Sequence, residues 1–130
     1  MLTSRGKERD ALTILLSRIP PTEIVWGLER IRSMLELVGE PQHSYESVLI
    51  GGTNGKGSVA AMAESLLRGC GYRTGLYTSP HLVEPAERIR IDGRPIDHLL
   101  LQQCASDILP YAERHGATFF ESITAVAWLA

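Results

Sequence analysis

The sequence predicts an α/β domain in which a parallel, P-loop-type sheet is flanked by helices. The apolar run Val48–Ile50 leads into a glycine-rich turn and then into a helical pattern that begins near Gly57. A second short strand pattern over residues 73–78 follows that helix and completes a β-α-β unit of about 30 residues. Because such crossovers are right-handed, the two strands are expected to lie parallel.

Helices are predicted before this unit, in a segment that extends to about residue 45. Residues 11–17 form a short helical pattern. Thr22 can cap a second helix, which Gly39 ends and which Pro41 prevents from resuming. This one-sided pattern is typical of a helix that packs on a core. Its apolar residues recur every three or four positions: Ile24, Leu28, Ile31, Leu35 and Val38.

The helix of the β-α-β unit is predicted from its apolar spacing. Val59, Met62, Leu66 and Cys70 recur at helical intervals, and Gly71 stands where a C-terminal cap belongs. The pattern therefore predicts a helix that runs from the glycine-rich turn to Cys70.

A hairpin and a further helix are predicted in the second half of the chain. Residues 88–91 have the pattern of a strand, Asp92-Gly93 is typical of a tight hairpin turn, and residues 94–96 form a brief return strand. Asp97 can cap a long helix that continues through Ile108. The chain closes with an apolar run over residues 123–130.

Composition narrows the class of protein. The chain has 130 residues, 44% of them hydrophobic, and can form one domain with its own core. Its net charge of −2 gives no reason to expect a nucleic-acid partner, and no apolar stretch is long enough for a membrane span. Cys70 and Cys104 have no ligand-spaced partners, so we expect reduced, buried cysteines and a cytoplasmic protein.

The glycine-rich turn is the strongest chemical signal. In Gly51-Gly52-Thr53-Asn54-Gly55-Lys56-Gly57-Ser58, glycines allow backbone N–H groups to face a phosphate closely, and Lys56 supplies positive charge. The following helix directs its positive dipole end to the same point. The common pattern G-x-x-x-x-G-K-[ST] is not met, because Ile50 occupies its first position and the hydroxyl comes one place late, at Ser58. An ordinary turn between strand and helix is the alternative explanation.

A second hydroxyl is expected near the same place. Ser79 follows the second predicted strand, and ligands of parallel sheets gather at the carboxyl ends of strands. Ser79 could therefore join Ser58 beside a magnesium ion bound to the phosphates. On local grounds, Ser79-Pro80 could equally well only begin a turn.

These motifs resemble the folylpolyglutamate synthase/dihydrofolate synthase family, within the wider group of Mur-type ATP-dependent amide ligases. The resemblance runs from about Pro21 to the end of the chain. The displaced hydroxyl after Lys56 is a feature of this family. The strings that carry the resemblance are Gly27-Leu28-Glu29-Arg30-Ile31, Gly52–Ser58, Gly71-Tyr72-Arg73, Tyr77–Leu82, Glu87–Ile91 and Thr118-Phe119-Phe120-Glu121.

The resemblance implies an ATPase-domain fold and an ATP- and Mg²⁺-dependent ligase that adds L-glutamate to dihydropteroate or folate. Lys56 would be the catalytic residue and Ser58 and Ser79 the metal ligands, while His81 would order its loop. The magnesium carboxylate lies on a later strand of the family, so Glu121 receives no such role. The nucleotide would be bound by Thr53, Asn54, Gly55, Lys56, Gly57 and Ser58, and the substrate by Thr118, Phe119 and Phe120.

The family's chains are much longer than this one, so residues 1–130 are expected to be the N-terminal part of the ligase's ATP-binding domain and to be inactive alone. We expect a monomer that acts on small molecules. Two alternatives stay open at this point. One is a catalytically inactive fragment that binds nucleotide or phosphate, and the other is a Mur-type ligase for a peptidoglycan precursor.

Overall fold

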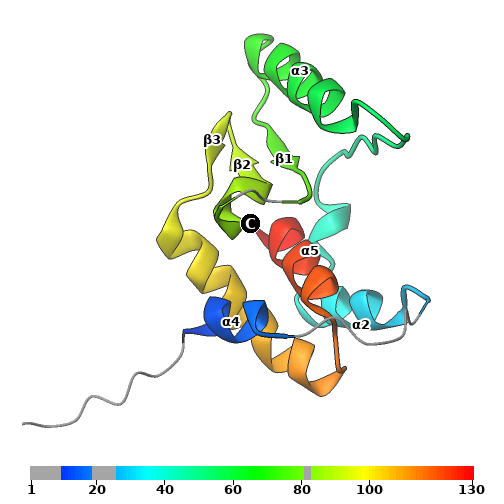
Figure 1. Cartoon of the computed structure of the whole chain (residues 1–130), viewed down its shortest axis with the longest axis vertical. Helices are drawn as coiled ribbons and strands as arrows, with labels where there is room; N and C mark the ends of the chain where they lie inside the picture. The colour runs from blue at the N-terminus through cyan, green and yellow to red at the C-terminus, as the bar shows by residue number, and fades with distance from the viewer. Residues whose placement is uncertain (1–9, 19–25, 81–82) are drawn as a thin grey trace, which may run out of the picture. The chain divides into compact units, whose positions relative to one another are not determined.

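The computed structural model describes residues 10–18, 26–80 and 83–130, which divide into two compact units. The first, which we call the helical unit, contains the described residues up to Ser44 together with Leu101–Ala130. The second, the loop–sheet unit, spans Tyr45–Leu100. Figure 1 traces the elements of both along the chain.

The helical unit is a set of packed helices around an apolar core. Helix α5 contacts α1, α2 and the 3-10 turn η1. The core residues are each at most 1% exposed: Leu15, Met34, Leu101, Ile108, Ile123 and Val126. The elements are α1 (Ala11–Leu16), α2 (Glu29–Leu37), η1 (Pro41–His43), α4 (His98–Arg114), whose first residues belong to the other unit, and α5 (Phe119–Leu129).

Side-chain caps explain where two of these helices, α1 and α4, begin. The Asp10 carboxylate accepts the Thr13 N–H at 2.7 Å at the start of α1. The Asp97 carboxylate accepts the N–H groups of Leu99 and Leu100 at the start of α4, as the sequence predicts. Each cap satisfies backbone donors that the first turn of a helix leaves unpaired.

The loop–sheet unit holds a small antiparallel sheet and one long helix. The strands lie in the order β1-β2-β3, and α3 contacts β1. Gly75 pairs with Ile91, and Ile91 in turn pairs with Arg94. The elements are α3 (Lys56–Gly69), β1 (Gly75–Tyr77), the 3-10 turn η2 (Pro85–Arg88), β2 (Ile89–Ile91) and β3 (Arg94–Pro95).

The hairpin between β2 and β3 confirms the prediction for residues 88–96. Asp92 and Gly93 form its two-residue turn with φ of 49° and 78°. Positive φ at both central residues gives the turn twist that matches antiparallel strands, and Asp-Gly tolerates it.

The predicted parallel sheet is not confirmed in the described part of the chain. Residues 48–50 form no strand, and the side chains of Val48 and Leu49 are 79% and 97% exposed. The strand predicted over residues 73–78 does form, as β1, but its partner β2 is antiparallel. Residues 48–50 pair with none of the three strands of the described sheet.

Two other predictions need correction. Helix α2 begins at Glu29, and the predicted continuous helix is interrupted at Gly27, whose φ of 124° a right-handed helix cannot include. Thr22 and Ile24 lie outside the described residues. Cys70 is exposed and only Cys104 is buried, since Cys70 ends α3 on a helix whose apolar stripe faces outward. Both cysteines are free, as expected.

Candidate functional site

The glycine-rich turn leads directly into the N-terminus of α3, a helix of 14 residues. Gly55 is its N-cap, with a φ of 73°, and no side chain caps the first turn. A Cβ added at Gly51, Gly55 or Gly57 would meet nothing within 4 Å, so the turn is open on the outside. The first amides of α3 therefore face space that an anion could occupy.

Lys56 is the first residue of α3, directly after the glycine-rich turn. Its ammonium group donates a hydrogen bond to the carbonyl oxygen of Gly52 at 2.5 Å. The hydrogen bond brings the positive charge back over the residues that precede the helix. Charge and uncapped amides thus meet at one turn, and residues 51–59 are all exposed.

The two predicted hydroxyl ligands lie in the same unit. Ser58 belongs to the first turn of α3, and Ser79 follows β1 after Thr78; both are exposed. Among residues 10–18, 26–80 and 83–130, no group of three or more His, Cys, Asp or Glu side chains could hold a metal ion. A metal ion bound by these two serine hydroxyls would therefore need oxygen atoms of a bound small molecule to complete its coordination. His81 and Leu82 lie outside the described residues.

A polar cluster joins α3 to the sheet. The Glu64 carboxylate is the only buried side chain of α3, and it accepts hydrogen bonds from Thr74 Oγ1 at 2.6 Å and Arg68 Nε at 3.1 Å. Asp92 accepts the Thr74 N–H at 2.9 Å and so connects the cluster to the hairpin. The Thr74 hydroxyl, with help from Arg68, lowers the pKa of Glu64, although burial and Asp92 act in the opposite sense.

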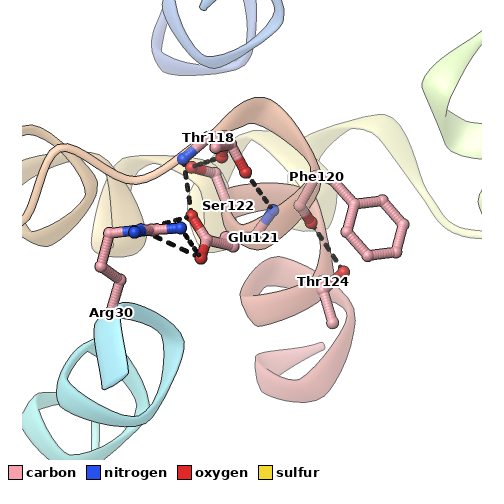
Figure 2. Close-up of polar contacts among 6 residues, drawn as sticks. All are labelled: Arg30, Thr118, Phe120, Glu121, Ser122 and Thr124. Atoms are coloured by element: carbon pink, nitrogen blue, oxygen red, sulfur yellow. Dashed lines mark hydrogen bonds and ion pairs between the residues drawn. The ribbon is translucent and has the colours of Figure 1, made fainter. Parts of the chain in front are cut away.

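The predicted substrate residues lie in the helical unit, at the start of α5. Thr118 is the N-cap: its hydroxyl accepts the Glu121 N–H at 3.2 Å, and its own N–H donates to Glu121 Oε2 at 2.8 Å. This reciprocal capping box fixes the first turn of α5 (Figure 2). Phe119 is half-buried, whereas Phe120 is 55% exposed.

Arg30, on α2, forms an ion pair with Glu121 in the same turn of α5. Its Nε lies 3.1 and 3.0 Å from the two carboxylate oxygens of Glu121, and its Nη2 lies 2.8 Å from Oε1. Figure 2 shows this pair on one side of the turn and the ring of Phe120 directed away from it. Glu121 is thus both an ion-pair partner of Arg30 and a capping residue of α5.

Local spacing in the sequence signals some of these contacts but not all of them. The spacing Thr118-x-x-Glu121 before an apolar run is itself a capping-box signal and could have predicted the start of α5. Glu64 and Arg68 stand four apart on a helix, which is the spacing of an ion pair. No local signal links Arg30 to Glu121, because 91 positions separate them.

No family model matches the chain. Among curated proteins, it is 52% identical over 83 residues to the dihydrofolate synthase/folylpolyglutamate synthase of Mycobacterium tuberculosis, a match covering 64% of this chain and 17% of the relative. It is 42% identical over 106 residues to a probable bifunctional folylpolyglutamate synthase/dihydropteroate synthase of Haloferax volcanii, covering 78% and 13%. The chain therefore spans less than a fifth of the length of these two relatives.

Solved structures give the same result. A folylpolyglutamate synthase of Thermotoga maritima matches with a TM-score of 0.80 and 38% identity over 91% of this chain and 28% of that one. The Mycobacterium tuberculosis folylpolyglutamate synthase complexed with ADP matches with a TM-score of 0.81, 38% identity and coverage of 91% and 28%. A bifunctional enzyme of Yersinia pestis complexed with AMPPNP and a manganese ion matches with a TM-score of 0.73, 29% identity and the same coverage.

Proposed function

The chain belongs to the folylpolyglutamate synthase/dihydrofolate synthase family, and from this premise we propose that it is the nucleotide-binding part of an ATP-dependent folate ligase. The whole enzyme would join L-glutamate to dihydropteroate or to a folate. The relatives reported above are all folate-type enzymes, so a peptidoglycan-precursor ligase is not favoured.

The observation that carries the proposal is the open glycine turn at the N-terminus of α3. Uncapped first-turn amides, a left-handed Gly55 and the Lys56 ammonium together form the donor set that phosphate oxygens require. Two structural relatives were solved with ADP or AMPPNP, which supports a nucleotide as the ligand. We propose that residues 53–58 bind the phosphates of ATP.

Within this site, each group of the chain has a separate task. The amides of residues 54–57 hold phosphate oxygens in place, and Lys56 offsets the negative charge that accumulates on the transferring phosphoryl group. Lys56 would exchange its hydrogen bond to Gly52 for one to a phosphate oxygen. We further propose that Val48–Ile50, which forms no strand in the described structure, forms the parallel strand that precedes the turn when a neighbouring strand of the whole enzyme pairs with it.

A divalent ion would complete the site. The Yersinia pestis relative was solved in complex with AMPPNP and a manganese ion, and magnesium is the ion we propose here. Such an ion would neutralise phosphate charge and align the phosphoryl group. Ser58 and Ser79 are the hydroxyls proposed to bind it.

The aromatic turn at the start of α5 is the proposed substrate contact. A flat pterin ring can rest against an aromatic face, and Phe120 presents most of its surface to solvent. Thr118 and Phe119 complete the turn. Residues 118–120 would thus contact the heterocycle without taking part in bond formation.

The proposed reaction has two chemical steps. A carboxylate oxygen of the folate attacks the γ-phosphorus of ATP, the bond to the β–γ bridging oxygen breaks, and ADP leaves with that electron pair. The amine nitrogen of L-glutamate then attacks the acyl carbon, loses a proton, and phosphate departs as the amide forms.

The expectations of a monomeric, cytoplasmic protein without a nucleic-acid or membrane partner remain part of the proposal.

Calorimetric titration with ATP and Mg²⁺ tests the proposal in the 130-residue chain. We expect one site, and Lys56→Ala should weaken ATP binding roughly tenfold or more, because it removes a charge-assisted hydrogen bond. Arg94→Ala is the matched control, since Arg94 is an exposed cation of the same unit. An equal loss of ATP affinity in both variants would show that only the net charge of the unit matters, and it would contradict the assigned role of Lys56.

A further inference from the structure

Arg30 connects two helices that are far apart in the sequence. It extends from the first turn of α2 to the first turn of α5, where its guanidinium contacts both carboxylate oxygens of Glu121. Such planar, two-point contact defines orientation as well as distance, which a single-point lysine contact does not.

The ion pair is more enclosed than an ordinary surface pair. The side chains of Arg30 and Glu121 are 24% and 12% exposed. Burial alone would raise the pKa of the Glu121 carboxyl, but hydrogen bonds from Arg30 and Thr118 outweigh burial and hold that pKa below its ordinary value. The hydrogen bond to Glu121 likewise raises the pKa of Arg30. Both groups are therefore charged across the neutral range.

The carboxylate of Glu121 also completes the capping box. The Oε2 atom of Glu121 accepts the Thr118 N–H and also a hydrogen bond from Arg30 Nε (Figure 2). One carboxylate therefore connects Arg30 to the backbone at the start of α5. The next two residues are Phe119 and Phe120. The turn that Glu121 caps and Arg30 contacts therefore carries both aromatic side chains.

Holding α5 in place does not require this pair. The body of the helix is anchored by Ile123, Ala125 and Val126, all at most 1% exposed. These buried apolar residues keep α5 packed against the rest of the helical unit. They restrict rotation and fraying of its first turn less, because apolar packing is not directional. The ion pair adds the directional contact at the end of the helix where the aromatic residues lie.

We infer that Arg30 is a positioning residue for the aromatic turn Thr118–Phe120, which it orients through Glu121 so that a flat heterocycle can bind. This inference rests on the proposed function. Arg30 itself does not touch the substrate in this account.

Folic acid binding to the 130-residue chain, followed by tryptophan fluorescence, tests the inference. Arg30→Lys keeps the charge and loses the two-point contact, so folic acid should bind about tenfold more weakly, as is typical when an orienting partner is lost. Binding of ATP with Mg²⁺ should stay unchanged. Arg32→Lys is the matched control on the same helix, since Arg32 is exposed.

Amide hydrogen exchange separates positioning from general stability. Arg30→Lys should speed exchange at the N–H groups of Thr118 and Glu121, while amides in the body of α4 keep their protection. Glu121→Gln provides a second test: its amide oxygen can still accept the Thr118 N–H, but the ion pair is gone, and the same loss of folic acid affinity is expected.

The outcomes distinguish the two proposals. Unchanged folic acid affinity in Arg30→Lys and Glu121→Gln, with normal binding by the wild type, would overturn the inference and leave the proposed function standing. Uniformly faster exchange throughout the helical unit would overturn it too, in favour of a purely structural role. A wild-type chain that binds ATP but no folic acid would refute the substrate assignment, and the inference with it.

Discussion

The two units of the molecule are stabilised by different means. Of the apolar side chains buried in the described residues, only Ile89 and Ile96 belong to the loop–sheet unit; the others belong to the helical unit. The loop–sheet unit instead exposes Leu49, Met62 and Leu66 at 97%, 59% and 73%, and joins its helix to its sheet through the buried Glu64. Apolar packing dominates the first unit, and directional polar contacts are prominent in the second.

The difference bears on function. A glycine turn that accepts a phosphate must be open to solvent and must offer unpaired backbone donors, and the loop–sheet unit has both at the start of α3. Aromatic side chains that bind a flat ligand need a rigid support, and in the helical unit the buried residues of α5 provide it. The proposed nucleotide and substrate contacts thus lie in units whose packing suits each role.

The largest expected effect comes from the core of the helical unit. Ile123→Ala should destabilise it by about 2–5 kcal/mol, because it leaves a cavity among fully buried neighbours. Met62→Ala, in the exposed stripe of α3, should change stability by less than about 0.5 kcal/mol. Urea denaturation followed by circular dichroism measures both. Comparable losses in the two variants would show that the contrast between the units is wrong.

A smaller effect is expected at the cap of α5. Thr118→Ala removes the hydroxyl that accepts the Glu121 N–H, and such a loss typically costs about 1 kcal/mol. The same denaturation experiment measures it, with Thr124→Ala as a control that removes a hydroxyl bonded within the body of the helix. If Thr118→Ala matched Ile123→Ala in its effect, capping rather than apolar packing would dominate the helical unit.

The smallest effect concerns pH and the polar cluster of the loop–sheet unit. Because the folded pKa of Glu64 is lowered, its contribution to stability is fully present above its ordinary pKa of 4.5 and is lost as the pH falls through the folded value. Arg68 supports the charged form, while Asp92 opposes it. Hydrogen exchange of the amides of β1 between pH 3 and pH 6 should show this loss in the wild type.

Glu64→Gln is the control for that experiment, since glutamine does not titrate. Its β1 amides should show a smaller pH dependence than the wild type, after correction for intrinsic exchange. An identical pH dependence in both proteins would mean that Glu64 does not hold α3 to the sheet.

Local patterns predict much of this fold. Asp97 as the cap of α4, the Asp92-Gly93 turn and the end of α3 near Gly71 follow from backbone preferences of neighbouring residues, and all are confirmed. The parallel strand at Val48–Ile50 is the main prediction that the described structure does not bear out, because strand formation depends on a partner and not on local preference. The prediction of one continuous helix ending at Gly39 is wrong at Gly27, because the backbone conformation of this glycine interrupts the apolar pattern.

The candidate site divides in the same way. The glycine turn and Lys56 could be identified from spacing alone, because phosphate binding uses consecutive residues of one turn. The contacts of Arg30 with Glu121 and of Glu64 with Thr74 could not, since each depends on how separate elements pack. Residue types reveal such pairs only after the fold has brought them together.

The most direct test of the account is an amide NMR titration of the 130-residue chain with ATP and Mg²⁺. We expect the largest chemical-shift changes at the N–H groups of Gly55, Lys56, Gly57 and Ser58, and their loss in Lys56→Ala. Nucleotide binding that left these amides unshifted, or no binding at all, would contradict the claim that the turn before α3 holds the phosphates.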